Sequence, residues 1–188
     1  DFIVAHPNCD RRGLVVAMLR GGFEFQGQKC SAASRCYIPR TVWNAIKDEY
    51  VEEVAKITMG APTDFSNFMT AVIDKKSFDN ITGYIDRAKA DSGCEVITGG
   101  GYDGSKGWFI EPTTIVCSDP NYESMSEEIF GPVLSVYVYE DDDFAATLEL
   151  CDNTSPYALT GSIFANEREA IVEAMDGLRF SAGNFYIN

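Results

Sequence analysis

Short apolar runs alternate along this chain with longer segments in which apolar residues recur every three or four positions. The runs have the length and residue types of buried strands. A helix between two strands returns the chain to the same edge of the sheet, so such strands pair in parallel. The pattern predicts an α/β fold with a largely parallel sheet and helices on both faces. The expected strands are 2-FIVA-5, 36-CYI-38, 95-EVIT-98, 109-FIEPTTIV-116, 133-VLSVYVY-139 and 159-LTGSIFA-165.

Five segments have the apolar spacing of helices packed on a sheet. The first is expected to follow a cap at Asn8 or Asp10, the second to begin at about Thr41, and the third to follow Ser77 as its cap. The last two are expected near 142–151 and 167–179. The apolar positions of the first three are Leu14, Val15, Met18, Leu19 and Phe23, then Trp43, Ile46, Tyr50, Val54 and Ile57, then Phe78, Ile81, Ile85 and Ala88.

Length and composition limit the classes of protein. The 188 residues, 45% of them hydrophobic, fit one domain over 1–188. A net charge of −14, with scattered Lys and Arg, argues against nucleic acid as a partner. No apolar run approaches the roughly 20 residues that span a bilayer, so we expect no membrane partner. Both ends lie in strand-like segments, so we expect the chain to be cut from a longer one.

Three polar motifs have structural explanations. The segment 99-GGGYDG-104 matches the GxGxxG pattern but leads into an extended segment rather than a helix, so we expect a surface turn and no dinucleotide loop. The acidic run 140-EDDD-143 is expected to cap the helix that follows it rather than bind a cation. His6, the one histidine, is expected to be structural, and pairing with a cysteine would require it to reach Cys30.

The six cysteines form no CxxC pair, which favours reduced thiols over a disulfide framework or a zinc site. Cys30 differs from the others because it follows the flexible Gly27 and stands beside the cation Lys29. If 31-SAAS-34 begins a helical turn, its N–H groups would favour a thiolate and a developing oxyanion. The residues alone leave both a buried packing cysteine and a nucleophile open.

A second segment, 127-EEIFGPV-133, places two carboxylates and an aromatic before a Gly-Pro break, which suggests a site loop. Together with 27-GQKCSAASR-35, in this order and at this separation, it strongly resembles the catalytic domain of the NAD(P)-dependent aldehyde dehydrogenase superfamily, over essentially the whole chain. Within the superfamily, 125-MSEEIFGPVLSVYVY-139 and 183-GNFYIN-188 are most similar to the subfamily that oxidises L-glutamate γ-semialdehyde in proline catabolism.

The resemblance implies roles for five residues. Cys30 would attack the aldehyde carbon, its backbone N–H would help to hold the oxyanion, and the resulting thiohemiacetal would lose hydride to give a thioester. Glu128 would hold the hydroxyls of the nicotinamide ribose and Phe130 would lie beside the nicotinamide. Ser31 and Lys29 would bind the α-carboxylate of the substrate.

The resemblance also implies NAD as cofactor, with NADP not excluded, a small-molecule aldehyde as substrate, a homo-oligomer at full length, and the bacterial cytoplasm or the mitochondrial matrix as location. The Glu-x-Gly-Gly segment that carries the superfamily's general base is absent between residues 1 and 188. The base, the oxyanion asparagine and the cofactor domain are therefore expected upstream, and the isolated chain is expected to be inactive. Glu24, the nearest acid before Cys30, projects from a helix and is not assigned as the base.

Three other readings stay open on the sequence. The chain can belong to another aldehyde dehydrogenase subfamily, or it can be a non-catalytic domain that keeps the fold. A cysteine hydrolase would need His6 as its general base.

Overall fold

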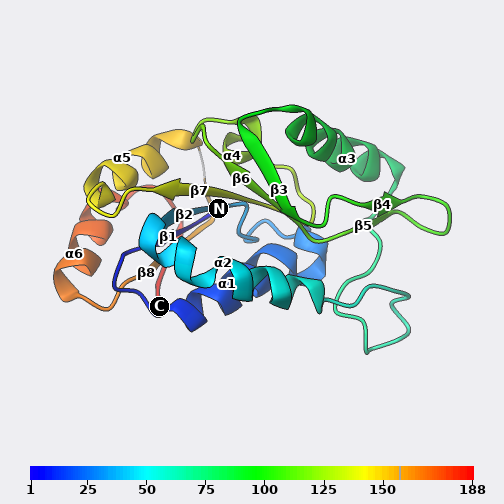
Figure 1. Ribbon diagram of the computed structural model, residues 1–188, viewed down its shortest axis with the longest axis horizontal. Helices are drawn as coiled ribbons and strands as arrows, with labels where there is room; N and C mark the ends of the chain where they lie inside the picture. Colours follow the sequence, from blue (N-terminus) through cyan, green and yellow to red (C-terminus); the bar gives the residue numbers. More distant parts are fainter. Residues whose placement is uncertain (157) are drawn as a thin grey trace.

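The predicted apolar runs form the central sheet of the computed structural model, which describes residues 1–156 and 158–188 (Figure 1). Seven strands lie in the order β3-β6-β7-β2-β1-β8-β9. All neighbours pair in parallel except β3, which runs antiparallel to β6. The strands are β1 (Phe2–Ala5), β2 (Arg35–Pro39), β3 (Cys94–Thr98), β6 (Thr113–Cys117), β7 (Val133–Tyr139), β8 (Thr160–Phe164) and β9 (Asn184–Ile187).

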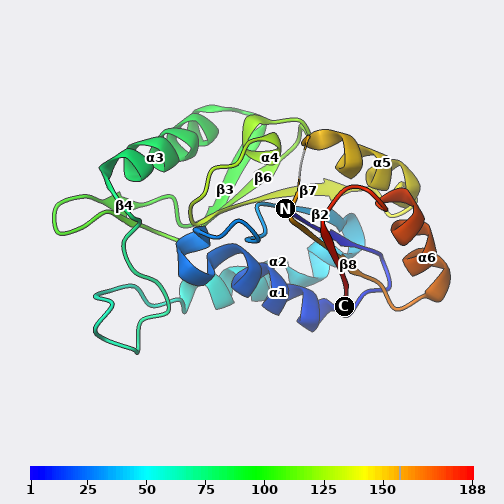
Figure 2. The same cartoon turned by 180° about the vertical axis from the view of Figure 1, so that it is seen from behind.

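Helices cover both faces of this sheet, as the alternation predicts. The helices α1 (Arg11–Phe23) and α2 (Arg40–Ala55) lie on one face, below the sheet in Figure 1. On the other face lie α3 (Lys75–Ala90), the short α4 (Glu123–Ser126), α5 (Phe144–Thr154) and α6 (Arg168–Gly177), which Figure 2 shows from behind. The fold is therefore of the predicted class.

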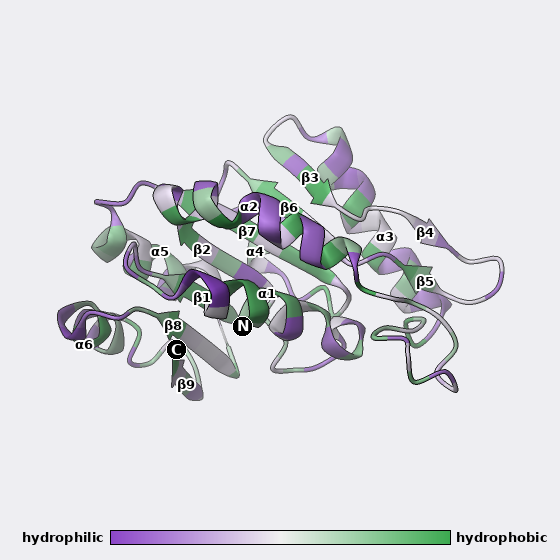
Figure 3. Cartoon of the chain, turned by 60° about the horizontal axis from the view of Figure 1, so that its bottom comes forward, coloured by the Kyte–Doolittle hydropathy of each residue, from purple (hydrophilic) through white to green (hydrophobic). Residues whose placement is uncertain are grey.

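Alternate residues of each strand enter the two cores, because successive side chains of a strand point to opposite faces. In β1, Phe2 and Val4 pack towards α3, α5 and α6, whereas Ile3 and Ala5 pack towards α1 and α2. Figure 3 shows the strands and the inner helix faces as largely hydrophobic, with the hydrophilic residues on the outer faces. The central strands β1 and β7 are buried on both faces, which explains why their sequences are nearly continuous apolar runs. None of the described helices is both long and apolar enough to cross a membrane.

Of the helix caps predicted at Asp10 and at Ser77, the first is confirmed and the second is wrong. The Asp10 carboxylate caps α1, accepting hydrogen bonds from the N–H groups of Arg12 (3.0 Å) and Gly13 (3.2 Å). Ser77 is not the cap of α3. Asp74 takes that place, and its carboxylate accepts the Ser77 N–H at 2.8 Å, so the helix starts earlier than predicted.

The acidic run caps a different helix from the one predicted. The Asp141 carboxylate accepts from the Thr41 N–H at 3.0 Å and from the Thr41 hydroxyl, both in the first turn of α2. Asp143, at the start of α5, makes no capping bond with its side chain. The reason is the register of β2 and β7, in which Pro39 lies opposite Tyr139 and so brings 140–141 beside the start of α2.

The predicted strand 109–116 is interrupted at its middle. Its first part is β5 (Phe109–Ile110), which pairs with β4 (Tyr102–Asp103) in a separate hairpin, and its second part is β6. Pro112 between them has no N–H to donate to a ladder. The turn predicted at the glycine-rich segment is confirmed, because Gly99 and Gly100 have φ of 64° and 82° and lead into β4 rather than a helix.

Candidate active site

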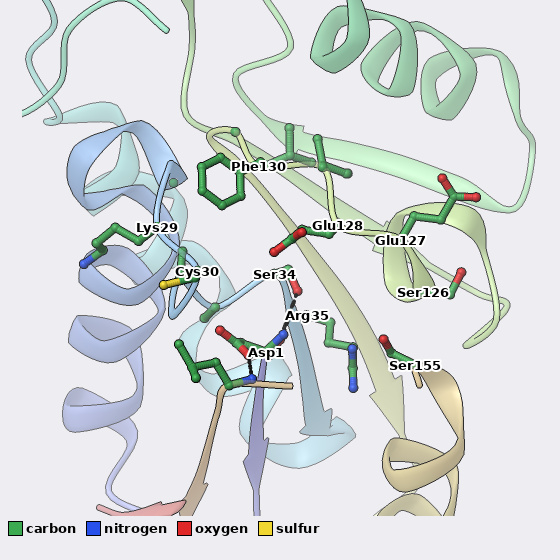
Figure 4. Close-up of a pocket in the computed structure, with 17 residues that line it drawn as sticks. Asp1, Lys29, Cys30, Ser34, Arg35, Ser126, Glu127, Glu128, Phe130 and Ser155 are labelled. Carbon is green, nitrogen blue, oxygen red and sulfur yellow. Dashed lines mark hydrogen bonds between the residues drawn. The ribbon is translucent and has the colours of Figure 1, made fainter. Parts of the chain in front are cut away.

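A cavity of about 200 Å³ opens at the amino-terminal ends of β1, β2, β7 and β8 (Figure 4). Asp1, Arg35, Val133 and Leu159 mark these four strand ends in its wall. In open parallel sheets a ligand usually binds at the carboxyl ends instead. His6 lies at the carboxyl end of β1, where its Nδ1 is 2.8 Å from the Asn8 Oδ1 and its ring meets Phe144 edge-on. The cavity and the histidine are thus at opposite ends of one strand, which removes the support for the cysteine hydrolase reading.

The segment before Cys30 turns sharply at the end of α1. Phe25, Gln26 and Gly27 have φ of 53°, 61° and 65°, a left-handed conformation that costs non-glycine residues about 1–2 kcal/mol each. Two hydrogen bonds to a remote segment hold this turn. The Gln26 Oε1 accepts the Thr70 N–H at 3.1 Å, and the Gln28 side chain accepts the N–H of residue 73 at 2.9 Å.

Cys30 lines the cavity and is exposed, whereas Cys94 is half-buried and the other four thiols are buried. The helical turn expected at 31–34 does not form. Instead the Ala32 N–H bonds to the Lys29 carbonyl at 3.1 Å in a single turn, and the Ala33 N–H bonds to Gly21 of α1 at 2.9 Å. Among the described residues, the Cys30 N–H has no hydrogen-bond acceptor. One backbone donor therefore stands beside the thiol, without a helix dipole behind it.

The cation expected near the Cys30 sulfur points elsewhere. The Lys29 Nζ lies 3.3 Å from the Glu24 Oε2 and 5.4 Å from the centre of the Phe25 ring. Figure 4 shows this side chain directed away from Cys30. The ion pair with Glu24, at the end of α1, is what draws the ammonium aside.

Ser31 is not brought into the same cavity. It lines a second cavity of about 350 Å³ between α1 and β8, together with Gly21 and Thr160. Its carbonyl accepts the Thr160 hydroxyl at 3.2 Å. The substrate-binding roles of Ser31 and Lys29 are thus not supported by a shared position, and both stay predictions.

Glu128 and Phe130 reach the cavity from the side opposite Cys30 (Figure 4). Phe130 is 44% exposed and has a φ of 60°, and the neighbouring Ile129 is buried and anchors the loop. The side chains of Glu127 and Glu128 point in different directions. Glu127 accepts a hydrogen bond from Tyr84, which is the main cause of raising the pKa of that phenol to about 12.

The Glu128 carboxylate accepts no hydrogen bond from the described residues, and it points into the cavity in Figure 4. It is therefore the member of the pair that is available to a ligand with vicinal hydroxyls, for which two carboxylate oxygens are suited. The role predicted for Glu128, the second acid of the pair, stays a prediction.

Sequence reasoning missed two charged residues of the cavity wall, Asp1 and Arg35. Arg35 is 3% exposed, its Nε has no partner among the described residues, and an Nη lies 3.5 Å from the Cys151 carbonyl. The Asp1 carboxylate accepts the N–H groups of Leu159 (2.7 Å) and Thr160 (3.0 Å). A charged residue at the start of a buried apolar strand was the available signal for Arg35.

A family model described as "Aldehyde dehydrogenase family" matches residues 1–188. The chain belongs to the aldehyde dehydrogenase family. Among the curated relatives, the mitochondrial delta-1-pyrroline-5-carboxylate dehydrogenase of Dictyostelium discoideum is 57% identical over the whole chain, and that of Homo sapiens is 45% identical. The chain spans 34% of the length of each of these relatives.

Solved structures of family members have the same fold. The Δ-pyrroline-5-carboxylate dehydrogenase of Mycobacterium tuberculosis, solved with NAD bound, matches all of the chain with a TM-score of 0.93 and 43% identity. The 1-pyrroline-5-carboxylate dehydrogenase from Thermus with bound NAD matches it with a TM-score of 0.87 and 29% identity. The chain covers 34% and 35% of these two structures, and its fold as a family catalytic domain follows from the likeness.

Proposed function

We propose that the protein at its natural length oxidises L-glutamate γ-semialdehyde to L-glutamate, with NAD as the hydride acceptor. The main support for the proposal is that Cys30, Glu128 and Phe130 line the same cavity. The relatives named delta-1-pyrroline-5-carboxylate dehydrogenase support the choice of substrate, and the NAD-bound structures support the choice of dinucleotide.

Cys30 supplies the covalent chemistry of this proposal. Its thiolate adds to the aldehyde carbon, and the Cys30 N–H, which lacks an acceptor among the described residues, can donate to the oxygen on which charge develops. The resulting thiohemiacetal loses a hydride to become a thioester, and water then releases the acid. NAD supplies the hydride acceptor when it is bound. No Glu-x-Gly-Gly segment occurs in the 188 residues, so the base for the hydrolysis is not assigned to a residue of this chain.

Glu128 and Phe130 fit the nicotinamide end of the dinucleotide. The Glu128 carboxylate, directed into the cavity and without a donor among the described residues, can accept two vicinal ribose hydroxyls. Phe130 presents a partly exposed ring on the same side. These contacts would place the dinucleotide opposite Cys30, where the hydride must be received.

The substrate's α-carboxylate is assigned to Ser31 and Lys29 because they flank Cys30 in the sequence, although Ser31 lines a different cavity. For Lys29 to reach it, the ammonium has to leave the ion pair with Glu24, in which the Lys29 side chain is 32% exposed. Partly exposed ion pairs contribute little stability, so a carboxylate on the substrate can compete for the ammonium.

The same proposal includes a small-molecule aldehyde as the ligand and a homo-oligomeric state at natural length. Several relatives are named as mitochondrial proteins, which favours the mitochondrial matrix over the bacterial cytoplasm. The chain's acidic composition gives no support to a nucleic-acid partner.

The deciding experiment compares kcat/KM for glutamate γ-semialdehyde and for propanal, using the natural-length protein with NAD and with NADP. We expect a preference of at least about 100-fold for the semialdehyde, since a site built to bind a carboxylate discriminates against a substrate that lacks it. Cys30→Ala should abolish turnover, whereas Cys9→Ala, a change far from the cavity, should not. Equal efficiency with the two aldehydes would contradict the proposed substrate, and turnover by Cys30→Ala would contradict the mechanism.

A further inference from the structure

Cys94 and Cys117 lie directly opposite each other in the antiparallel pair β3–β6. The ladder bond next to them joins the Ser118 N–H to the Gly93 carbonyl at 2.8 Å, whereas the Cys94 N–H turns to Asp91 at 3.1 Å. The two cysteines therefore do not exchange backbone hydrogen bonds with each other. They occupy the non-hydrogen-bonded type of site, in which facing side chains come closest.

The geometry of such a site suits a disulfide. Facing Cα atoms at a non-hydrogen-bonded site are about 4.5 Å apart. The Cα atoms of native disulfides are usually about 4.4–6.8 Å apart, so this separation suits a disulfide. Both side chains also lie on the same face of the sheet, since Cys117 belongs to the core cluster against which Cys94 packs. A bond between the sulfurs therefore needs rotation of side chains and no displacement of the backbone.

We propose that Cys94 and Cys117 form a site of reversible oxidation, at which a hydroperoxide converts the two thiols into a disulfide. Cys94 is half-buried on the edge strand, whereas Cys117 is 2% exposed behind it. Cys94 is accordingly the thiol that meets the oxidant, and Cys117 is the thiol that resolves the product. The pair plays no part in the function proposed above.

The chemistry balances with hydrogen peroxide as the oxidant. The Cys94 thiolate attacks one peroxide oxygen, the O–O bond breaks, and a sulfenic acid and water result. The Cys117 sulfur then attacks the Cys94 sulfur, the S–O bond breaks, and a second water leaves with the Cys117 proton. Two thiols are oxidised and one peroxide is reduced to two waters.

The surroundings favour a small neutral oxidant. Asp91 and Asp119 both contribute to raising the pKa of Cys94, and the whole chain carries a net charge of −14. An anionic disulfide such as oxidised glutathione would be repelled at this edge. Burial is the largest cause that raises the pKa of both thiols, so the reaction is slower than that of an exposed thiol under the same conditions.

The disulfide would join the outermost strand to the sheet without disturbing the cavity. The Cys117 sulfur lies 3.7 Å from the Ser124 Oγ of α4, the helix that leads to Glu128. Ser124 is also held by the Ser135 hydroxyl, which lies 2.7 Å from its Oγ and 3.0 Å from its carbonyl. Because the two Ser135 bonds involve neither cysteine, they can hold α4 in place after oxidation, and we expect Cys30 to keep its reactivity.

The test treats the natural-length protein with hydrogen peroxide, blocks the remaining thiols and maps tryptic peptides without reduction. Trypsin places Cys94 in the peptide 90–106, and Cys117 together with Cys151 in 107–168. The Cys151→Ser variant therefore makes the assignment unique, since Cys117 is then the one cysteine left in the second peptide. We expect the two peptides to be linked, to separate on reduction, and to remain unlinked in Cys94→Ser.

A sulfenic acid probe at Cys30 serves as the control that the peroxide has acted. If Cys30 is oxidised while both Cys94 and Cys117 remain free to alkylation after unfolding, the proposal is wrong. It is also wrong if Cys94 is linked to any other cysteine. A second readout is hydrogen exchange, which should slow at least about threefold for the β3 amides in the linked protein and recover on reduction.

Discussion

Gly27 and Gly131 touch through their backbones. A Cβ on Gly27 would lie 2.1 Å from the Gly131 carbonyl oxygen and 2.9 Å from the Gly22 carbonyl oxygen. Gly27 precedes Cys30 and Gly131 follows Phe130, so this contact joins the two segments that form opposite sides of the cavity. Two segments far apart in the sequence are thus in direct main-chain contact at the cavity, with no room for a side chain between them.

Gly27→Ala should therefore destabilise the protein and disturb the cavity. The φ of 65° disfavours an L-residue, and the clash with a backbone carbonyl cannot be relieved by rotating a side chain. We expect the free energy of unfolding, measured with urea, to fall by at least about 2 kcal/mol, because the backbone strain and the steric conflict add together. The matched control is Gly83→Ala in α3, where the nearest atom is the far end of the long Arg87 side chain at 3.3 Å rather than a backbone carbonyl.

The control should be neutral or more stable by about 0.5–1 kcal/mol, because alanine is the better helix residue. Equal unfolding midpoints for the two variants would show that the contact at Gly131 yields to a Cβ without cost.

Cys30 should be the most reactive of the six thiols. It is the exposed one, whereas burial raises the pKa of Cys9 to about 11 and of Cys117 to about 12, and raises that of Cys36 further. Brief alkylation with less than one equivalent of reagent, followed by peptide mapping, measures the order of reaction. Preferential labelling of Cys36 or Cys117 would contradict the burial described above.

The elements of the fold followed from the sequence where local signals suffice. A strand such as β7 is a run of β-branched and aromatic residues, and α1 is bounded by a capping aspartate, so both could be predicted from the chain itself. The cap at Asp141 could not be predicted, because its target Thr41 becomes its neighbour only through the register of β2 and β7. The prediction of Ser77 as the cap of α3 was wrong because Asp74, three residues earlier, caps the helix instead.

Four of the five residues predicted for the site line one cavity, whereas Ser31 lines another, and the roles of all five stay predictions. The motifs around Cys30 and Glu128 identified which segments meet, and the cavity contains both. The direction of Lys29 depends on Glu24 at the end of α1, and the separate cavity of Ser31 depends on the packing of β8. Such contacts arise from tertiary packing, which the order of residues does not show. Arg35 was missed although its charge at the start of an apolar strand is visible in the sequence, because its place in the cavity wall arises from tertiary packing.

The cap at Asp141 can be tested by substitution. Asp141→Ala should destabilise the protein by about 1 kcal/mol, the usual cost of losing a helix cap. Asp142→Ala removes an exposed neighbour of the same charge and should change stability by less than about 0.5 kcal/mol. Urea unfolding at neutral pH compares the two. If both variants unfold at the same urea concentration, the bonds to Thr41 contribute nothing to stability.

Glu128 and Glu127 should differ in their effect on the dinucleotide. Glu128→Gln replaces one accepting oxygen in the cavity and should weaken NAD binding by about tenfold, the effect of about 1.4 kcal/mol. Glu127→Gln changes the carboxylate that is bonded to Tyr84 and should have less than about a threefold effect. Calorimetric titration of the natural-length protein with NAD measures both. A larger loss for Glu127→Gln would reverse the assignment of the pair.

Stability should fall at alkaline pH because of the buried thiols. In the folded chain burial raises the pKa of Cys9 to about 11 and of Cys117 and Cys151 to about 12, whereas unfolded thiols ionise near about 8.5. A raised folded pKa gives stability that is fully present below the unfolded pKa and is lost as pH rises towards the folded one. Between pH about 9 and 11 the unfolded chain therefore loses protons that the folded chain keeps.

Each such thiol lowers the free energy of unfolding by up to about 1.4 kcal/mol per pH unit in this window. Urea unfolding at a series of pH values, followed by the fluorescence of the buried Trp43, measures the total slope. Cys151→Ala removes core packing and so lowers stability at every pH. It should also reduce the slope of the free energy of unfolding against pH by the contribution of one thiol, so the slopes are compared and not the absolute stabilities. The matched control Val54→Ala also costs core packing but removes no titrating group, so it should leave the slope as it is. The prediction is contradicted if the slope falls equally in both variants, or if stability does not change up to pH about 11. Either result would mean that the buried thiols ionise as readily in the folded chain as in the unfolded one.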